Sequence, residues 1–263
     1  MIIEQIWTGN AYRNFNYLVA CPQTGDALAI DPLDSQRCAQ RANELGLKIT
    51  AILNTHHHAD HIGGNKALRK TTGAMLYAHA DAVDRIPSVD QTLVAGDTIT
   101  VGQLAPLKCL DTPGHTMSHI CLFADGDAPV LFSGDTMFNA GAGNCHNGGH
   151  PEALYATFRD QISQLPETTR LYPGHEYLAT NLKFTLSLEP DNTAAVEMLA
   201  LAEQQDPNDA HVTTLAEEST FNTFLRLDSA ALLKTLVHRY PELGPNPSDK
   251  TIFIKLRELR NNW

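Results

Sequence analysis

The 263-residue chain is predicted to have an α/β fold, with strands dominating the first two-thirds and helices the remainder. Two observations predict this. Short apolar segments with the character of buried strands recur as far as residue 173. After residue 175 no convincing strand remains, and helical segments alternate with breaks that contain Pro and Asn. A chain of this length can bury a good core in one large domain, or in a large and a small one.

The expected elements follow one another along the chain. Strands are expected near residues 2–7, 14–20, 26–31 and 49–54, and a helix from Ser35 to Leu45. Further strands are expected up to Phe132, followed by a helix from Pro151 to Leu165 and a strand before Gly174. Helices are then expected over Tyr177 to Leu188, Thr193 to Gln205, Ser229 to Tyr240 and Asp249 to Arg260. The boundary between two domains, 1–175 and 176–263, is therefore placed after His175.

Four histidines and an aspartate lie within residues 56–61, directly after an expected strand. Imidazole nitrogen and carboxylate oxygen are ligands that zinc accepts. In an extended segment side chains alternate, so His56 and His58 are expected on one side and His57 on the other. Asp60 and His61 follow where the chain turns, and they can bind a second ion. Because the run is internal and follows a strand, it is not an expression tag, and it predicts half of a two-metal site.

Three later apolar segments each end in a glycine followed by one potential ligand: Gly114-His115, Gly134-Asp135 and Gly174-His175. Glycine lets the backbone turn sharply at a strand end. Each pair alone is usually a turn, but four ligand clusters in order along the chain predict one shared site. One ion is expected on His56, His58, His115 and Asp135, and the other on Asp60, His61, His175 and the same bridging Asp135.

The His-x-His-x-Asp-His run and the order of the later ligands resemble the metallo-β-lactamase superfamily. The resemblance implies an αββα sandwich of two mixed sheets, with helices outside and the metals at one edge. Segments after the last ligand are similar to glyoxalase II, the hydroxyacylglutathione hydrolase: Gly174-His175-Glu176-Tyr177, Asn181-Leu182-Lys183-Phe184, Leu215-Ala216-Glu217-Glu218 and Asn222-Thr223-Phe224-Leu225-Arg226. The resemblance covers essentially the whole chain and implies a catalytic domain over 1–175 and a helical substrate-binding domain over 176–263.

The ligand set and this resemblance imply a binuclear metal-dependent hydrolase. Two ions about 3.5–4 Å apart share a hydroxide whose parent water has a pKa of roughly 7. The hydroxide would attack the thioester of S-(2-hydroxyacyl)glutathione, such as S-lactoylglutathione, and release a 2-hydroxy acid and a free thiol, a step of methylglyoxal detoxification. Asp60 is expected to orient the hydroxide. Zinc is the expected metal, with iron or manganese as alternatives. Asp31 is expected either to orient a ligand histidine or to serve only as a turn residue.

Glyoxalase II enzymes bind the glutathione part through a tyrosine after the last metal histidine, two basic residues near the C-terminus and a loop after the bridging aspartate. Tyr177 matches the tyrosine, and Arg257 and Arg260 match the basic pair, which on a helix shares one face; a solvated helix face is the alternative. The loop 141–149 departs from the pattern, with Asn144 at the expected basic position and His146 near an expected tyrosine. This departure indicates weaker glutathione binding, a different thiol carrier or a different acyl group.

Other residues near the site have lesser expected roles. His57 is expected to pack or hydrogen-bond behind the ligand loop, and His119 to lie just outside the ligands. Cys145 is expected to pack, with a reactive role left open. The alternative functions are a persulfide dioxygenase with a single iron, a β-lactamase or lactonase, and a non-catalytic metal-binding protein. The helical tail and the complete second ligand set disfavour the dioxygenase. The tail and the segment Gly174-His175-Glu176-Tyr177 disfavour the β-lactamase and the lactonase. The absence of cysteine from the ligands disfavours a structural zinc site.

The resemblance implies a small-molecule partner, the thioester substrate, and the composition argues against other classes of partner. A formal net charge of -11 argues against a basic nucleic-acid-binding surface. No signal peptide or membrane span is expected, and five cysteines without a C-x-x-C pair suit a reducing compartment, so a cytoplasmic protein is expected. A monomer or weak homo-oligomer is expected.

Overall fold

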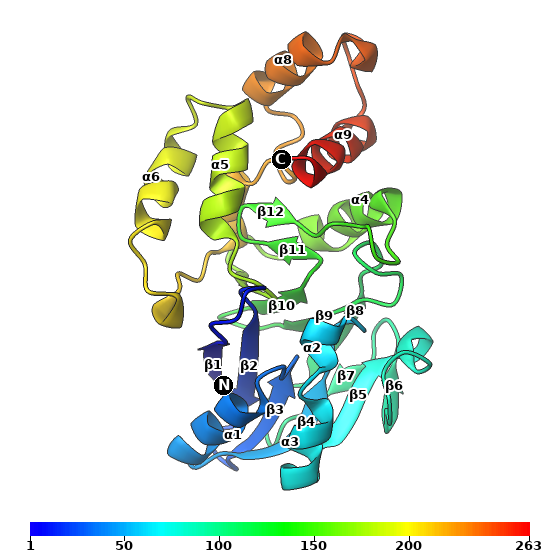
Figure 1. The fold of residues 1–263 in the computed structure, drawn as a ribbon, viewed down its shortest axis with the longest axis vertical. Helices are drawn as coiled ribbons and strands as arrows, with labels where there is room; N and C mark the ends of the chain where they lie inside the picture. The colour runs from blue at the N-terminus through cyan, green and yellow to red at the C-terminus, as the bar shows by residue number, and fades with distance from the viewer.

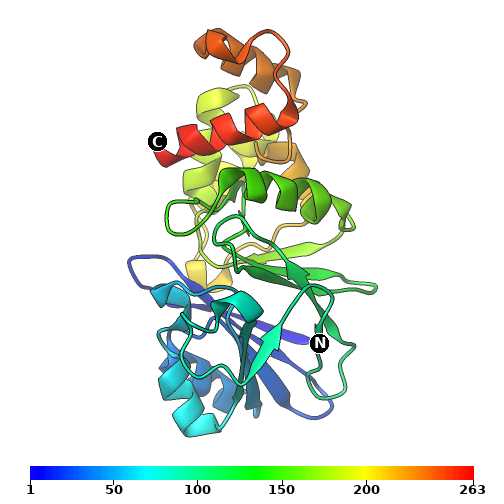
Figure 2. The ribbon, with the colours of Figure 1, turned by 90° about the vertical axis from the view of Figure 1, so that its right-hand side faces the viewer.

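The computed structural model describes residues 1–263. Figure 1 shows the first sheet and its helices in the lower half of the molecule, and helices α5, α6, α8 and α9 in the upper half. In the perpendicular view of Figure 2 the two halves remain stacked, with the C-terminus among the upper helices. None of the helices combines the length and the apolar character needed to cross a membrane.

Six strands form the first sheet, in the order β1-β2-β3-β4-β5-β6. Their bounds are β1 Ile2–Trp7, β2 Phe15–Ala20, β3 Asp26–Ile30, β4 Lys48–Leu53, β5 Met75–His79 and β6 Gln91–Leu93. Strands β1 to β3 are antiparallel, whereas β3 to β6 are parallel. Parallel strands end at the same edge of a sheet, so Asp31 after β3 and the histidine run after β4 emerge side by side.

Five strands form the second sheet, in the order β13-β10-β9-β8-β7. Their bounds are β7 Thr98–Ile99, β8 Leu107–Asp111, β9 Ile120–Ala124, β10 Val130–Gly134 and β13 Arg170–Pro173. A separate hairpin, β11 Met137–Phe138 and β12 Gly141–Ala142, follows β10. Because β10 and β13 are parallel, Asp135 and His175 leave the same edge of this sheet.

Alternating side chains along β2 pack its sheet on both faces. Phe15, Tyr17 and Val19 belong to the core between the two sheets, whereas Leu18 and Ala20 belong to the core under the outer helices. Those outer helices are α1 Ser35–Glu44 and α3 Asn65–Thr72.

Strand β10 shows the same alternation in the second sheet. Val130 and Phe132 face the first sheet, and Leu131 packs with Leu154 and Phe158 of helix α4 Pro151–Asp160. The layers are therefore helix, sheet, sheet, helix, which confirms the predicted αββα sandwich of two mixed sheets. The expected helix from Pro151 to Leu165 ends earlier, and a 3-10 turn, Ile162–Gln164, completes it.

Helices make up the chain after β13, as predicted. They are α5 Leu178–Leu188, α6 Thr193–Ala202, α7 Leu215–Phe221, α8 Ala230–Arg239 and α9 Asp249–Asn261. Helix α7 was not predicted. The pattern Thr-x-x-Glu at residues 214–217 is typical of helix N-termini and could have predicted its start. In the structure Thr214 and Glu217 form a reciprocal capping box.

Candidate metal centre and substrate cavity

The histidine run leaves the end of β4 and enters the short helix α2 Ala59–Ile62. His58 is the N-cap residue, so Asp60 and His61 lie where the chain turns, as predicted. Asn54 Nδ2 donates to the His61 carbonyl at 3.1 Å, and Asn65 Nδ2 donates to Asn54 Oδ1 at 2.6 Å. Both asparagines are buried, so this amide pair fixes the turn that aims Asp60 and His61.

The remaining predicted ligands follow strand ends of the second sheet. His115 comes after β8, Asp135 directly after β10, and His175 shortly after β13. Glycine is required beside His175, because a Cβ at Gly174 would lie 2.3 Å from Asp135 Oδ1 and 3.0 Å from His61 Cε1. The backbone of Gly174 thus allows two strand ends and α2 to meet.

Six of the seven predicted ligands form two groups, each with its ligand atoms within 4.8 Å of one another: His56, His58 and His115, and Asp60, His61 and His175. In the first group, His58 Nδ1 lies 3.0 Å from both His56 Nε2 and His115 Nε2. In the second group, the Nε2 atoms of His61 and His175 are 3.3 Å apart. These are the two sets expected from the sequence.

The carboxylate of Asp135 lies between the two groups. Its Oδ2 is 3.4 Å from His115 Nε2 and 3.2 Å from His175 Nε2, and its Oδ1 is 3.4 Å from His61 Nε2. Burial alone would raise the pKa of Asp135, but His175 and His61 outweigh burial and hold it well below its usual value. Asp135 is therefore ionised, and its buried Oδ1 has no hydrogen-bond partner in the chain.

Each of the five histidines faces a hydrogen-bond acceptor outside the centre through its other ring nitrogen. The pairs are His56 Nδ1 with Thr55 Oγ1 at 3.0 Å, His58 Nε2 with the Asn147 carbonyl at 3.0 Å, His61 Nδ1 with Asp31 Oδ2 at 2.9 Å, His115 Nδ1 with the Asn144 carbonyl at 2.7 Å, and His175 Nδ1 with the Tyr12 carbonyl at 2.7 Å. Carbonyl and carboxylate oxygens only accept, and the Thr55 hydroxyl already donates its proton to Asp31 Oδ2, so the outward nitrogens carry protons.

In the group of His56, His58 and His115 the inward nitrogens consequently present lone pairs to one another. His61 differs, because Asp135 and Asp31 outweigh burial and raise its pKa well above its usual value, so a metal ion would displace a proton there. Burial lowers the pKa of His56 well below its usual value and that of His115 to about 4, so both rings are neutral. Lone pairs facing each other at 3.0 Å repel, and a bound cation would remove this conflict. Five imidazoles and two carboxylates without cysteine suit zinc, iron or manganese. The residues fit a two-metal site.

Asp31 holds His61 rather than offering a ligand of its own. Its Oδ1 accepts from Thr55 N at 2.8 Å, and its Oδ2 accepts from Thr55 Oγ1 at 2.6 Å and from His61 Nδ1 at 2.9 Å. Its oxygens are thus engaged, although Asp31 lies within ligand-atom range of His56 and His61. Of the two roles considered from the sequence, orienting a histidine is the one that these contacts support.

The variant Asp31→Asn is expected to lower the metal affinity of the site about 10–100-fold, the usual effect of losing a carboxylate behind a metal-binding histidine. Competition with a chelator of known affinity measures this. Asp34→Asn is the matched control, because Asp34 caps α1 and pairs with Arg37 without touching a predicted ligand, and asparagine caps equally well. Equal affinities in the two variants would contradict the role of Asp31.

His57 and His119 both lie outside the ligand groups, as predicted. His57 Nε2 accepts from Arg85 Nη1 at 2.9 Å, and burial together with Arg85 lowers the pKa of His57 to about 4. His119 is completely buried, and its Nε2 accepts from the Asp135 backbone N–H at 3.1 Å. His119 therefore positions the main chain of Asp135.

The role of residues 12–14 was not predicted from the sequence. Asn14 Nδ2 donates to Asp60 Oδ2 at 3.1 Å and to the Asp60 carbonyl at 3.2 Å. Tyr12 contributes only its backbone carbonyl, to His175. A backbone acceptor has no side-chain signature, and Asn14 lies far from Asp60 in the chain.

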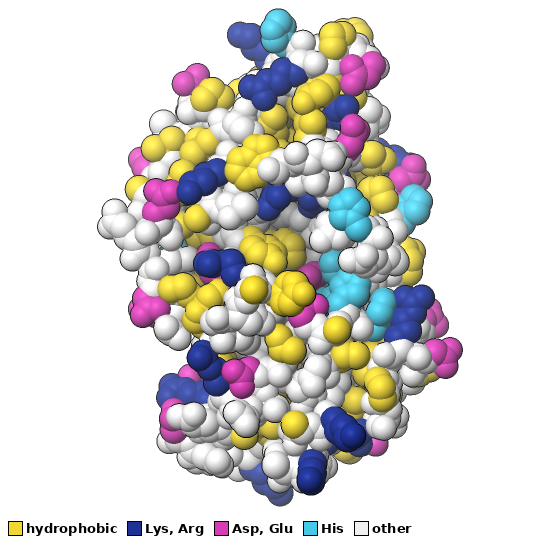
Figure 3. Space-filling model, in the orientation of Figure 1, with side chains coloured by type: hydrophobic (Ala, Val, Ile, Leu, Met, Phe, Trp, Pro, Cys, Tyr) yellow, Lys and Arg dark blue, Asp and Glu magenta, His cyan; other side chains and the backbone are white.

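A cavity of about 230 Å³ is lined by all five residues predicted to contact substrate: Tyr177, Arg257, Arg260, Asn144 and His146. Phe138 also lines it. The rings of Tyr177 and Phe138 pack on His175 at centroid distances of 5.0 and 5.8 Å, so the cavity borders the metal centre. Figure 3 shows histidines and cationic side chains gathered around a hollow in the middle of this face.

The two arginines of α9 enter this cavity from one helix face. Arg257 is only 4% exposed, which excludes a solvated position, and its Nη1 donates to the carbonyls of Ala142 and Gly143. Arg260 donates from Nε and Nη2 to Asn181 Oδ1, both at 3.2 Å. Burial and the neighbouring Arg260 lower the pKa of Arg257 to about 10, so it stays charged. Neither cation has a carboxylate partner among the ion pairs of the chain, which favours an anionic ligand.

The loop 141–149, which departs from the family pattern, contributes main-chain groups to the site more than side chains. The Asn144 carbonyl accepts from His115, and the Asn144 side chain accepts from the His146 backbone N–H at 3.2 Å. His146 itself is exposed at the rim. Cys145 packs against the core below α4 and α9, and burial raises its pKa to about 11. The cysteine is thus protonated, consistent with packing.

Two family models match the chain in succession. The metallo-beta-lactamase superfamily matches residues 14–175, and the hydroxyacylglutathione hydrolase C-terminus matches residues 176–263. A hydroxyacylglutathione hydrolase from Nitrosococcus oceani is 59% identical over 263 residues, covering 100% of both chains. The chain belongs to the hydroxyacylglutathione hydrolase (glyoxalase II) family. It is therefore a thioester hydrolase, as predicted.

Other relatives of this glyoxalase II family member support the same assignment. A hydroxyacylglutathione hydrolase from Polaromonas sp. is 57% identical over the full length of both chains. The cytoplasmic enzyme of Arabidopsis thaliana is 34% identical over 94% of this chain and 93% of its own. Among solved structures, ETHE1 from Myxococcus xanthus has a TM-score of 0.67 at 27% identity, covering 99% and 98% of the two chains. TTHA1623, solved in a di-iron-bound form, has a TM-score of 0.60 at 25% identity, covering 84% and 99%. The alternative functions are not favoured.

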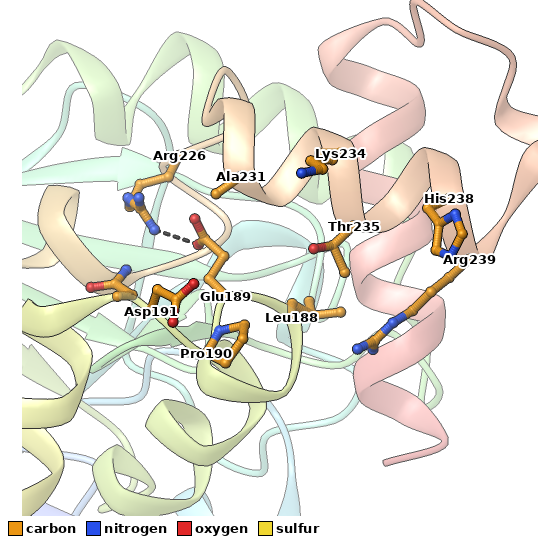
Figure 4. Close-up of a pocket in the computed structure, with 11 residues that line it drawn as sticks. Leu188, Glu189, Pro190, Asp191, Arg226, Ala231, Lys234, Thr235, His238 and Arg239 are labelled. Atoms are coloured by element: carbon orange, nitrogen blue, oxygen red, sulfur yellow. Dashed lines mark hydrogen bonds and ion pairs between the residues drawn. The ribbon is translucent and has the colours of Figure 1, made fainter.

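A larger cavity, of about 500 Å³, lies among α5, α6 and α8, and no predicted ligand lines it. Figure 4 shows Glu189 and Arg226 joined by an ion pair in its wall. The Glu189 side chain is 2% exposed and also accepts from Ser229 Oγ at 2.7 Å. In this glyoxalase II family member the pair ties the end of α5 to the segment before α8.

Breaking this pair is expected to destabilise the fold. Arg226→Met should reduce the free energy of unfolding by about 3 kcal/mol, because it leaves the Glu189 carboxylate buried without a cation. Urea denaturation measures the loss. Lys234→Met is the control, since Lys234 lines the same cavity without an ion-pair partner, and it should change stability by less than about 0.5 kcal/mol. Similar losses of unfolding free energy in both variants would contradict a stabilising role of the Glu189–Arg226 ion pair.

Proposed function

We propose that the protein hydrolyses S-(2-hydroxyacyl)glutathione, such as S-lactoylglutathione, to a 2-hydroxy acid and free glutathione. His56, His58 and His115 would hold one divalent ion, Asp60, His61 and His175 the other, and Asp135 both. The supporting observation is the grouping of five imidazole rings and Asp60 around the buried Asp135 carboxylate, which lies 3.2–3.4 Å from the Nε2 atoms of His61, His115 and His175. When bound, two such ions would lower the pKa of a water molecule and polarise the thioester carbonyl.

The protein groups around the attacking water orient it. Asn14 Nδ2 occupies Asp60 Oδ2, which leaves Oδ1 to accept a hydrogen bond from the water and direct its lone pair at the thioester carbon. Asp31 and the carbonyls of Tyr12, Asn144 and Asn147 keep the rings in place. A free thiol has a pKa of about 8.5, so a thiolate leaves without a strong general acid.

The cavity beside the centre would hold the glutathione part. Arg257 and Arg260 attract a carboxylate of the tripeptide, and Tyr177 forms the wall nearest His175. The Tyr177 hydroxyl donates to the Tyr12 carbonyl at 3.0 Å, so its oxygen remains to accept from a peptide N–H. Asn144 adds no charge to this cavity. We therefore propose that residues 1–175 carry the reaction and residues 176–263 supply the binding cations.

We also propose zinc as the resident metal and the cytoplasm as the location. The donor set suits zinc, with iron or manganese as alternatives. All five cysteines are free thiols, which suits a reducing compartment, and the Arabidopsis thaliana relative is named cytoplasmic.

A hydrolysis panel tests the substrate. S-lactoylglutathione, other glutathione thioesters, polyamine-thiol thioesters and coenzyme A thioesters are compared by release of free thiol. We expect the highest kcat/KM with S-lactoylglutathione. A higher value with a thioester of another carrier would contradict the glutathione assignment and would point to the substituted Asn144 loop as its cause.

A further inference from the structure

The β11–β12 hairpin connects the metal centre with the substrate cavity. It begins two residues after Asp135, and its Phe138 packs on His175 and Tyr177. At its tip, Ala140 is completely buried and takes a left-handed φ of 55°. A residue with a Cβ is disfavoured in this conformation. The hairpin therefore needs support from outside itself.

The buried carboxylate of Glu218, on α7, supplies that support. Its Oε2 accepts from the Ala140 backbone N–H at 2.8 Å and from Asn222 Nδ2 at 2.9 Å. Its Oε1 accepts from Thr213 Oγ1 at 2.7 Å and from Asn139 Nδ2 at 3.4 Å. All four partners are neutral donors. An ionised carboxylate is the form that accepts from all of them at once.

The same network continues to the cavity wall. Asn222 Nδ2 is also 3.3 Å from the Gly141 carbonyl. On the other side, Asn181 Nδ2 donates to the Asn139 carbonyl at 2.9 Å. Asn181 in turn accepts from Arg260. A contiguous hydrogen-bond path thus joins Glu218 to Arg260, which lines the cavity, and to Gly141, which precedes the lining residue Ala142.

We propose that Glu218 is a positioning residue for thioester binding, which fixes the hairpin tip and through it Phe138 and the Ala142–Asn144 wall of the cavity. The inference rests on the proposed function, because it takes this cavity as the substrate site. Burial raises the pKa of Glu218 to about 7, so the ionised form that suits its four donors carries a desolvation cost.

The variant pair Glu218→Gln and Glu217→Gln tests the proposal. The amide keeps the size of Glu218 but turns an N–H group against two of the four donors. We expect KM for S-lactoylglutathione to rise about five- to tenfold, the effect of one or two lost hydrogen bonds, with kcat within about twofold and metal content unchanged. Glu217 caps α7 through Thr214 and does not touch the hairpin, so Glu217→Gln should leave KM unchanged.

A second readout does not depend on activity. The Ala140 amide should be protected from hydrogen exchange in the wild type and exchange faster in Glu218→Gln. Unchanged KM and unchanged Ala140 protection would overturn the proposal. If Glu218→Gln does not fold, Thr213→Val removes one donor to the carboxylate, and about a twofold rise in KM is expected; no rise would equally overturn it. A wild type inactive on every glutathione thioester would instead contradict the proposed function, and the exchange result would still decide whether Glu218 holds the hairpin.

Discussion

Replacing Asp135 with asparagine is expected to reduce thioester hydrolysis more than about 100-fold and to lower the metal content below two equivalents. Removing a residue behind the ligands commonly costs 10–100-fold, and Asp135 is expected to contact both ions. Its carboxylate lies 3.2–3.4 Å from nitrogens of both ligand groups. An amide is neutral and offers one acceptor oxygen in place of two. Steady-state kinetics together with metal analysis of the purified variant measure both effects.

Asp111→Asn is the matched control for this variant. Asp111 also lies at the end of a strand, but its carboxylate faces His79 at 3.3 Å and none of the predicted ligands. The control should retain two metal equivalents and wild-type turnover. A fully active, fully loaded Asp135→Asn protein would contradict the bridging role.

Removal of the Arg260 guanidinium is expected to raise KM for a glutathione thioester about tenfold or more with little change in kcat. Hydrogen bonds between charged groups are worth about 1.5–3 kcal/mol, and Arg260 is the less constrained of the two cavity arginines. Arg257→Ala should raise KM and also lower kcat and Tm. Its side chain holds the Ala142 and Gly143 carbonyls, next to the Asn144 carbonyl that orients His115.

Lys255→Ala is the control on the same helix. Lys255 lies near Glu242 and Glu258 and over the Tyr240 ring, away from the cavity, so KM should not change. If Arg260→Ala left KM at the wild-type value, the cavity would not be the binding site of the anionic part of the substrate.

Much of the fold and site was predictable because the signals are local. A buried strand followed by a glycine and one ligand marks three strand ends, and these converge with the histidine run after β4 once β3 and β4, and β10 and β13, run parallel. The i, i+3 spacing of Arg257 and Arg260 likewise places them in one cavity, since α9 is regular throughout.

The residues that support the ligands and the cavity could not be predicted, because they lie far in the sequence from the groups that they contact. Asn14 contacts Asp60 from 46 residues away, and Glu218 contacts Ala140 from 78 residues away. No local pattern marks such pairs. The burial of Arg257 depends on packing between α9 and the loop carbonyls, so a helix-face argument alone left a solvated position open. The start of α7, by contrast, was visible in its capping box.

Metal reconstitution tests the central claim, a binuclear thioester hydrolase, most directly. The protein is stripped with a chelator and titrated with zinc while free thiol released from S-lactoylglutathione is recorded at each step. We predict that activity rises until two equivalents are bound and then stays constant, with His61→Ala lacking the second equivalent. Full activity at one equivalent, or a protein that hydrolyses no thioester but consumes oxygen in a persulfide-dependent reaction with a single iron, would contradict it.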